Sequence, residues 1–286
     1  MAREAEDLSL TSGPALPYRL AMYLNDHPEV LPRFFATQGA LEAFATTLTM
    51  LKPAVKAQAL RIANRLIIKI ASQVADSGFQ SGPLTWSRQD NFSLDLDAER
   101  TVEAYLNDPA GGLAGKLVFP ERRRERRVII LMLDHSYSMK GIKMLLAGIC
   151  AASVAAHCRQ DYGVIVFSKQ GQVLKPLSGW QHAEVVLEKI FNLNLDGDTN
   201  LRSALELGLK ELRGCEKKTG LLLTDGNWNT GGDPQELAVL FDKLNIICFP
   251  PANPDKIKEL ALAGKGAFMF VTKESEIPGA ITRCLG

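Results

Sequence analysis

From Val128 onward, short apolar runs alternate with longer amphipathic segments, and this alternation constrains the fold more than any other feature. The runs are too short for helices and nearly continuous in apolar residues, as strands buried on both faces are. They cover residues 128–133, 162–167, 221–224, 246–249 and 267–271. The segments between them have helical length and cover residues 139–158, 183–191, 201–212, 234–244, 254–263 and 275–284. The pattern predicts βαβ units.

Repeated βαβ units build an open, mostly parallel sheet with helices on both faces. We therefore expect a Rossmann-like, doubly wound α/β domain over residues 121–286. Upstream, apolar residues recur at helical spacing over residues 28–50, and Pro53 suits the first turn of another helix. A short helix is expected over residues 97–106, loops over 77–91 and 107–115, and almost no convincing strand. We predict a small all-α domain with a linker over residues 1–120.

The composition excludes several classes of protein. The formal net charge is +1, so no strong overall field draws the chain to nucleic acid or to a membrane surface. The five cysteines are scattered and form no CxxC pair, which argues against a disulfide framework. The N-terminal sequence has no apolar core typical of a signal peptide, and no apolar run approaches the roughly 18 residues of a membrane span. We expect a cytoplasmic protein without a membrane span.

Oxygen-bearing side chains follow the predicted strands. The first strand runs into Asp134, which is followed by Ser136 and Ser138. Asp225 follows the strand at 221–224, and Thr199 precedes the helix that begins near residue 201. Open α/β sheets bind ligands at the carboxyl ends of their strands. Carboxylates and hydroxyls suit Mg²⁺, Mn²⁺ or Ca²⁺ better than zinc or copper.

A plainer interpretation competes for the first of these segments. Asp and Ser are favoured N-caps, and a helix is predicted to follow Asp134, Ser136 and Ser138. Taken alone, that segment fits a capped helix start as well as a metal site. The presence of Thr199 and Asp225 at matching positions favours the metal. We expect Asp198 to cap the helix near residue 201, and Asp196 to be solvated.

These residues resemble the metal-ion-dependent adhesion site (MIDAS) of von Willebrand factor A (VWA) domains. The family pattern is D-x-S-x-S, then a Thr in G-x-T-N, then an Asp in T-D-G. The sequence has DHSYS at 134–138, GDTN at 197–200 and TDG at 224–226, and the resemblance covers roughly residues 125–286. It implies that Ser136, Ser138 and Thr199 contact the metal directly, and that Asp134 and Asp225 bind directly or through water.

One position departs from the family pattern. Tyr137 stands where intracellular members commonly have Gly, which tolerates a positive φ. The departure concerns the conformation of the loop and leaves the ligand set unchanged. We expect Tyr137 to cover the metal or to touch a partner, and we leave His135 out of the site.

The resemblance implies a metal-dependent protein-binding module rather than an enzyme, with a partner's Asp or Glu completing the Mg²⁺ (or Mn²⁺ or Ca²⁺) shell. Helical regions followed by a VWA domain resemble CoxE-like proteins that work beside a MoxR-type AAA+ ATPase. This implies an adaptor or co-chaperone in protein or metal-cofactor maturation. A component similar to the D subunit of magnesium chelatase is the alternative, but residues 1–120 are too short for its AAA-like module and lack its phosphate loop.

Other classes fit less well. A haloacid-dehalogenase-like Mg²⁺-dependent phosphatase needs a carboxylate two residues after its first Asp, and Ser136 occupies that position. A serine hydrolase lacks its G-x-S-x-G elbow. The Walker pattern fails because Ala110 and Leu117 stand at required positions. The run at 121–127 has five arginines but no aromatic platform for nucleic acid, so we interpret it as a solvated linker.

Overall fold

The computed structural model describes residues 16–37, 39–78, 84–87, 96–109, 112, 116–122, 128–158 and 161–285. Contacts divide the chain into two compact units, one formed by residues 1–78 and 127–286 and the other by residues 79–126. This division differs from the boundary near residue 120 that the sequence suggests. The cause of this difference is one helix of the larger unit, α7 (Ile142–Cys158), which the N-terminal helices cover.

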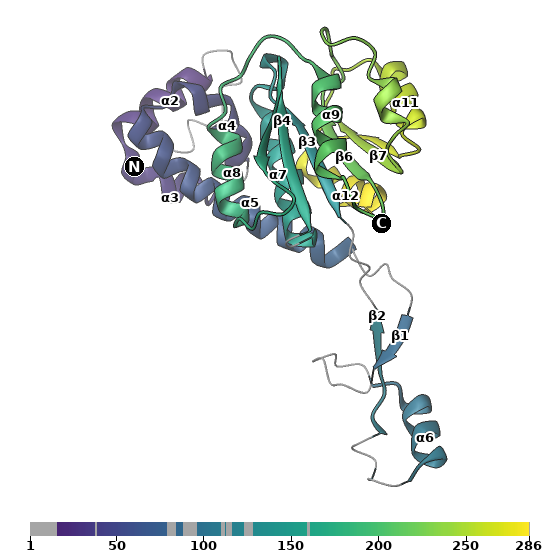
Figure 1. The fold of residues 1–286 in the computed structure, drawn as a ribbon. Helices are drawn as coiled ribbons and strands as arrows, with labels where there is room; N and C mark the ends of the chain where they lie inside the picture. Colours follow the sequence, from purple (N-terminus) through teal and green to yellow (C-terminus); the bar gives the residue numbers. More distant parts are fainter. Residues whose placement is uncertain are drawn as a thin grey trace. The chain divides into compact units, whose positions relative to one another are not determined.

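A six-stranded, mostly parallel sheet forms the centre of the larger unit (Figure 1). The strand order is β5-β4-β3-β6-β7-β8, and only β5 runs antiparallel to its neighbour. The strands are β3 (Ile129–Asp134), β4 (Tyr162–Phe167), β5 (Gly171–Lys175), β6 (Thr219–Thr224), β7 (Lys243–Cys248) and β8 (Phe268–Phe270). The predicted Rossmann-like fold is confirmed.

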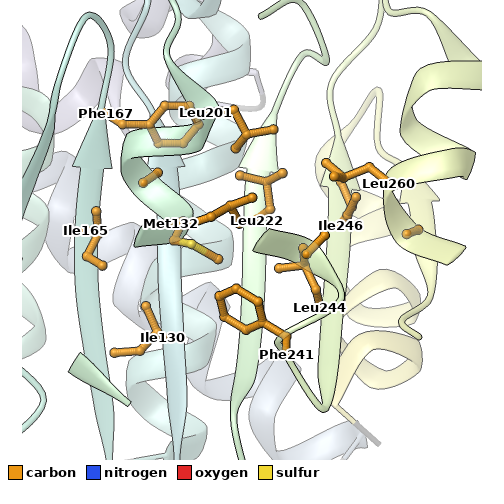
Figure 2. Close-up of a cluster of buried hydrophobic side chains, with 14 of the residues drawn as sticks. Ile130, Met132, Ile165, Phe167, Leu201, Leu222, Phe241, Leu244, Ile246 and Leu260 are labelled. Atoms are coloured by element: carbon orange, nitrogen blue, oxygen red, sulfur yellow. The ribbon is translucent and has the colours of Figure 1, made fainter. Parts of the chain in front are cut away.

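Helices cover both faces of this sheet. One face packs against α9 (Leu201–Glu211), α10 (Gln235–Ala238) and α11 (Pro254–Ala263). Figure 2 shows Ile130, Met132 and Phe241 in the buried cluster on that face. The other face packs against α7 (Ile142–Cys158) and α12 (Ile277–Leu285). Both faces of β3 are therefore shielded from water, which explains its unbroken apolar sequence.

Helix α7 is apolar almost all round, because it has neighbours on both sides. The sheet lies on one side, while α5 (Pro53–Gly78) and α8 (Ala183–Phe191) pack against it as well. Gly148 permits a close approach here, since a Cβ at this position would lie 2.6 Å from the Phe191 ring. Without α5, much of the apolar surface of α7 would face water. The N-terminal helices and the sheet consequently form one unit.

The N-terminal region is helical, as predicted. Its elements are α2 (Leu16–Asp26), η1 (Pro28–Val30), α3 (Leu31–Phe34), α4 (Ala40–Thr47), η2 (Leu48–Met50) and α5. Pro53 opens α5, where its missing N–H is not needed. Among the residues that the structure describes, no helix combines the length and the apolar character needed to span a bilayer.

The smaller unit corrects the expectation that almost no strand lies upstream of residue 120. β1 (Leu84–Ser87) pairs antiparallel with β2 (Phe119–Arg122), and β1 falls inside the loop expected at 77–91. The helix α6 (Ala98–Asn107) appears where a helix was expected, with the Asp97 carboxylate capping the N–H of Arg100. β2 also takes up the start of the arginine run, whose remainder at 123–127 lies outside the described residues.

Two details of the α/β part differ from the sequence analysis. β5 was not anticipated, because GQVLK is a short edge strand with only one fully buried residue, Lys175. The helix expected over residues 234–244 shrinks to the four residues of α10. It is short because β7 already begins at Lys243, so the apolar residues at the end of that segment belong to a strand.

Candidate metal centre

The carboxylate of Asp134 lies fully buried at the end of β3, where two neighbours donate hydrogen bonds to it. Its Oδ1 accepts the N–H of Ser136 at 2.8 Å, and its Oδ2 accepts the hydroxyl of Thr224 at 2.7 Å. The Thr224 oxygen in turn accepts the N–H of Gly226 at 3.0 Å. Because β3 and β6 are parallel neighbours, their carboxyl ends meet, and this network ties the two loops together.

The loop after Asp134 brings two hydroxyls together. Ser136 and Ser138 lie with their Oγ atoms 3.1 Å apart, Ser136 being buried and Ser138 exposed. The 3₁₀ turn η4 (Tyr137–Met139) shapes the loop. The N–H of Tyr137 donates to the carbonyl of Asp196, which fixes the loop against the segment before α9. The loop thus presents both serine hydroxyls at the edge of the sheet.

Tyr137 fits the loop without the backbone freedom of glycine. Lys265 is the only non-glycine with a positive φ in the part of the chain that the structure describes. The side chain of Tyr137 is 62% exposed, with the Lys140 ammonium 5.6 Å from its ring centroid. A tyrosine at this position therefore costs no left-handed strain and presents an aromatic ring beside the two serines.

Asp225 lies just after β6 and is also fully buried. Its Oδ2 accepts the ammonium of Lys143 at 2.9 Å, and its Oδ1 accepts the N–H of Asn227 at 3.3 Å. Lys143 belongs to the first turn of α7, so this ion pair crosses from the helix to the β6 loop. The sequence indicated neither Lys143 nor the bond from Thr224 to Asp134. A single lysine in a mostly apolar helix was the signal that could have identified Lys143.

Thr199 lies in a third loop at the rim of the sheet, the edge where β3 and β6 end. Its N–H donates to the Asn229 side chain at 2.9 Å, and its carbonyl accepts the N–H of Asn229 at 3.1 Å. Thr199 is 3% exposed. Asn200, the next residue, donates its N–H to the carbonyl of Ser168 at 2.7 Å. Thr199 is therefore linked to the Asp225 loop through Asn229, and the loop that carries it is also anchored to the segment after β4.

Burial dominates the electrostatics of Asp134 and His135. It raises the pKa of Asp134 from 3.8 to about 6, and the nearby charge of Asp225 adds to the increase. Hydrogen bonds from Ser136 and Thr224 oppose it. Burial lowers the pKa of His135, whose Nδ1 lies 3.1 Å from the carbonyl oxygen of Asn194. His135 is thus engaged away from the serines.

The helix-cap interpretation of the first segment does not describe this loop. Helix α7 begins only at Ile142, and Asp134 accepts hydrogen bonds from Ser136 and Thr224 instead. The expected cap of α9 was also misplaced. Asn200, not Asp198, is the N-cap, and its side chain accepts the N–H of Ser203. Asp196 is exposed, as expected.

The donor set fits a hard divalent cation. Two buried carboxylates lie at neighbouring strand ends beside serine hydroxyls, and together these are oxygen ligands of the kind that Mg²⁺ and Ca²⁺ prefer. The described residues contain no cluster of three or more His, Cys, Asp or Glu side chains arranged to hold a metal. Any ion here would depend on hydroxyls in addition to Asp134 and Asp225.

A cavity of about 380 Å³ adjoins the loop that carries Asp225. Its lining includes Trp228, Asn229, Pro234, Lys256 and Glu259. The ammonium of Lys256 lies 5.6 Å from the centroid of the Trp228 ring. The surface beside the Asp225 loop is thus concave, with an aromatic wall and both signs of charge.

The family model of the von Willebrand factor type A domain matches residues 128–282, and the chain belongs to this family. The match covers all five of the candidate ligands. Domains of this family usually bind protein partners. A comparison with curated proteins found no match.

Several solved structures are similar to the α/β part of the chain. An aerotolerance-related membrane protein from Bacteroides fragilis is 20% identical, with a TM-score of 0.49, and the match covers 56% of this chain and 98% of that one. BatB from Bacteroides thetaiotaomicron is 18% identical (TM-score 0.43; 55% and 96% covered). Proximal thread matrix protein 1 from the mussel byssus, with a zinc-occupied MIDAS motif, is 16% identical (TM-score 0.46; 55% and 46% covered).

Proposed function

We propose that the chain is a metal-dependent protein-binding module. Asp134, Ser136, Ser138, Thr199 and Asp225 would hold one Mg²⁺, or Mn²⁺ or Ca²⁺ in its place. When bound, the ion supplies an electrophilic position that a carboxylate of a partner protein fills. The chain itself provides the rigid rim, and we propose that it performs no catalysis.

The observation that carries this proposal is the pair of buried carboxylates at the ends of β3 and β6. A fully buried carboxylate is costly unless it is paired or binds a metal. Among the residues that the structure describes, Asp134 has only neutral donors, Ser136 and Thr224, and burial raises its pKa to about 6. Two serine hydroxyls lie within the same loop, with Oγ atoms 3.1 Å apart. A divalent cation would supply the charge that Asp134 lacks, whereas Asp225 already has the Lys143 ammonium beside it.

We further propose that the partner is a MoxR-type AAA+ ATPase or its client, and that the chain acts in the cytoplasm as an adaptor or co-chaperone in protein or metal-cofactor maturation. Support for this comes from the arrangement of a helical region before a VWA domain, which resembles CoxE-like proteins. The N-terminal helices pack on the VWA domain through α7, so a partner would meet one continuous unit.

An affinity capture in Mg²⁺ and in EDTA tests the proposal. The immobilised chain should recover an AAA+ ATPase from an extract of the source cells in Mg²⁺ and lose it in EDTA. Asp225→Ala should abolish the recovery while the protein stays folded by circular dichroism. Asp255→Ala is the matched control, because it removes an exposed carboxylate at the start of α11. Equal recovery in Mg²⁺ and EDTA would contradict the proposal.

A phosphatase assay tests the competing enzyme class. With p-nitrophenyl phosphate and Mg²⁺, we expect no turnover above the uncatalysed rate. Ser136 occupies the position where a phosphatase of this kind needs a general acid, and in the structure Ser136 donates its N–H to Asp134. Turnover that disappears in Asp134→Asn would overturn the assignment as a binding module.

A further inference from the structure

Lys143 is the only Lys, Arg, Asp or Glu in the seventeen residues of α7. Its ammonium lies 2.9 Å from Oδ2 of Asp225, a residue that is fully buried. The side chain of Lys143 is itself only 18% exposed. The helix thus carries one charge, and that charge meets a proposed metal ligand.

This ion pair changes the charge of the rim. When Asp134 and Asp225 are both ionised, the Lys143 ammonium leaves the rim with a net charge of minus one. A bound divalent cation then brings the rim to plus one, whereas without Lys143 it would be neutral. Charges separated by a few ångströms interact strongly in a buried setting, so a difference of one unit affects every ion that enters.

We propose that Lys143 sets the selectivity of this site for anionic partners, at the expense of metal affinity. The inference rests on the proposed function, because it concerns the same metal centre. Lys143 competes with the metal for Oδ2 of Asp225 and repels it. Once the metal is bound, the positive charge that remains attracts one carboxylate. The residue is a positioning residue that acts through Asp225.

The proposal predicts opposite effects on two affinities, which a merely structural role of Lys143 would not produce. Removing the charge should tighten metal binding and weaken carboxylate binding. Lys143→Met removes the charge with little change in side-chain length. Lys143→Gln also removes it but keeps a hydrogen-bond donor for Asp225, so it guards against loss of folding. Lys143→Arg keeps the charge.

The first measurement is the affinity for Mn²⁺, which is detected through the electron paramagnetic resonance signal of the free ion. Lys143→Met and Lys143→Gln should bind Mn²⁺ about tenfold more tightly than the wild type, the ratio expected for about 1.4 kcal/mol of relieved repulsion. Lys143→Arg should stay within about twofold. Lys140→Met is the matched control, because it removes an exposed ammonium three residues earlier that does not reach Asp225.

The second measurement uses acetate as the probe on the Mn²⁺-loaded protein. Acetate displaces metal-bound water, which lowers the water-proton relaxation rate. Lys143→Met and Lys143→Gln should need about tenfold more acetate than the wild type, since the loaded rim has lost its net positive charge. The role of Lys143 would be overturned if these two variants bound Mn²⁺ no more tightly than Lys140→Met. It would also be overturned if their acetate binding were unchanged. A wild type that binds no Mn²⁺ would instead remove the metal centre itself.

Discussion

Two regions of the larger unit both bury side chains, but one buries apolar side chains and the other buries carboxylates. At the α5–α7 interface, α5 buries Ala59, Ala63 and Ile67, and α7 is mostly apolar, with Lys143 as its only Lys, Arg, Asp or Glu. At the rim where β3 and β6 end, the buried side chains include Asp134 and Asp225. The α5–α7 interface joins the N-terminal helices to the sheet, whereas the rim concentrates oxygen atoms.

The two regions therefore contribute differently to the free energy of unfolding. Apolar burial is favourable by about 25 cal/mol per Å², so the α5–α7 interface stabilises the fold directly. Burying a carboxylate is unfavourable without partners, and the rim supplies these as Thr224, the N–H of Ser136 and Lys143. Substitutions in the interface should therefore cost the most stability, whereas substitutions of the candidate ligands at the rim should chiefly change what it binds.

The largest effect on stability is expected from Ile67→Ala. Ile67 is fully buried in the middle of α5, and the truncation leaves a cavity. The free energy of unfolding should fall by about 3 kcal/mol, measured by urea denaturation. Arg65→Ala, an exposed change in the same helix, should alter it by less than about 0.5 kcal/mol. A small loss for Ile67→Ala would mean that α5 is not integral to the unit.

A smaller loss is expected from Thr224→Val, which keeps the shape of the side chain but removes the hydroxyl that donates to Asp134. The carboxylate would then lack one donor in a buried position, at a cost of about 2 kcal/mol in EDTA. Thermal or urea denaturation measures this loss. Thr219→Val at the other end of β6 is the control and should be nearly neutral. Equal stability of the two variants would show that Thr224 does not hold Asp134.

The smallest effect on stability is expected at two positions just before α9. Asn200→Ala removes the side-chain acceptor that caps the N–H of Ser203 and should lower the free energy of unfolding by about 1 kcal/mol. Asp198→Ala removes a residue that does not cap the helix and should stay within about 0.5 kcal/mol. The reverse order of the two losses, measured by urea denaturation, would restore Asp198 as the cap.

The sheet could be predicted because its central parallel strands are buried on both faces and are mostly apolar in sequence. β5 escaped detection because an edge strand needs no such run, and GQVLK has neither length nor alternation. The joining of the N-terminal helices to the sheet was also missed. Its signal was present in α7, since a helix that is apolar all round requires cover on more than one side.

The candidate ligands could be named from sequence because strand ends and the resemblance to VWA domains place them. Their partners could not be named in the same way. The bond from Thr224 to Asp134 spans 90 positions and the ion pair from Lys143 to Asp225 spans 82, so neither has a local signature. Asn200 and not Asp198 is the cap, because α9 begins at Leu201. Both residue types are favoured caps, so the sequence could not fix the start of the helix to within two residues.

The most direct test of the account is a calorimetric titration of the metal-free protein with Mn²⁺, beside the same titration of Ser136→Ala/Ser138→Ala. One ion should bind per chain of the wild type. Binding should stabilise the protein against unfolding by about 2.7 kcal/mol when the free ion is at a hundred times its Kd. Both should be lost in the double variant, whose fold is retained. Equal Mn²⁺ binding by the two proteins would contradict the assignment of the metal centre.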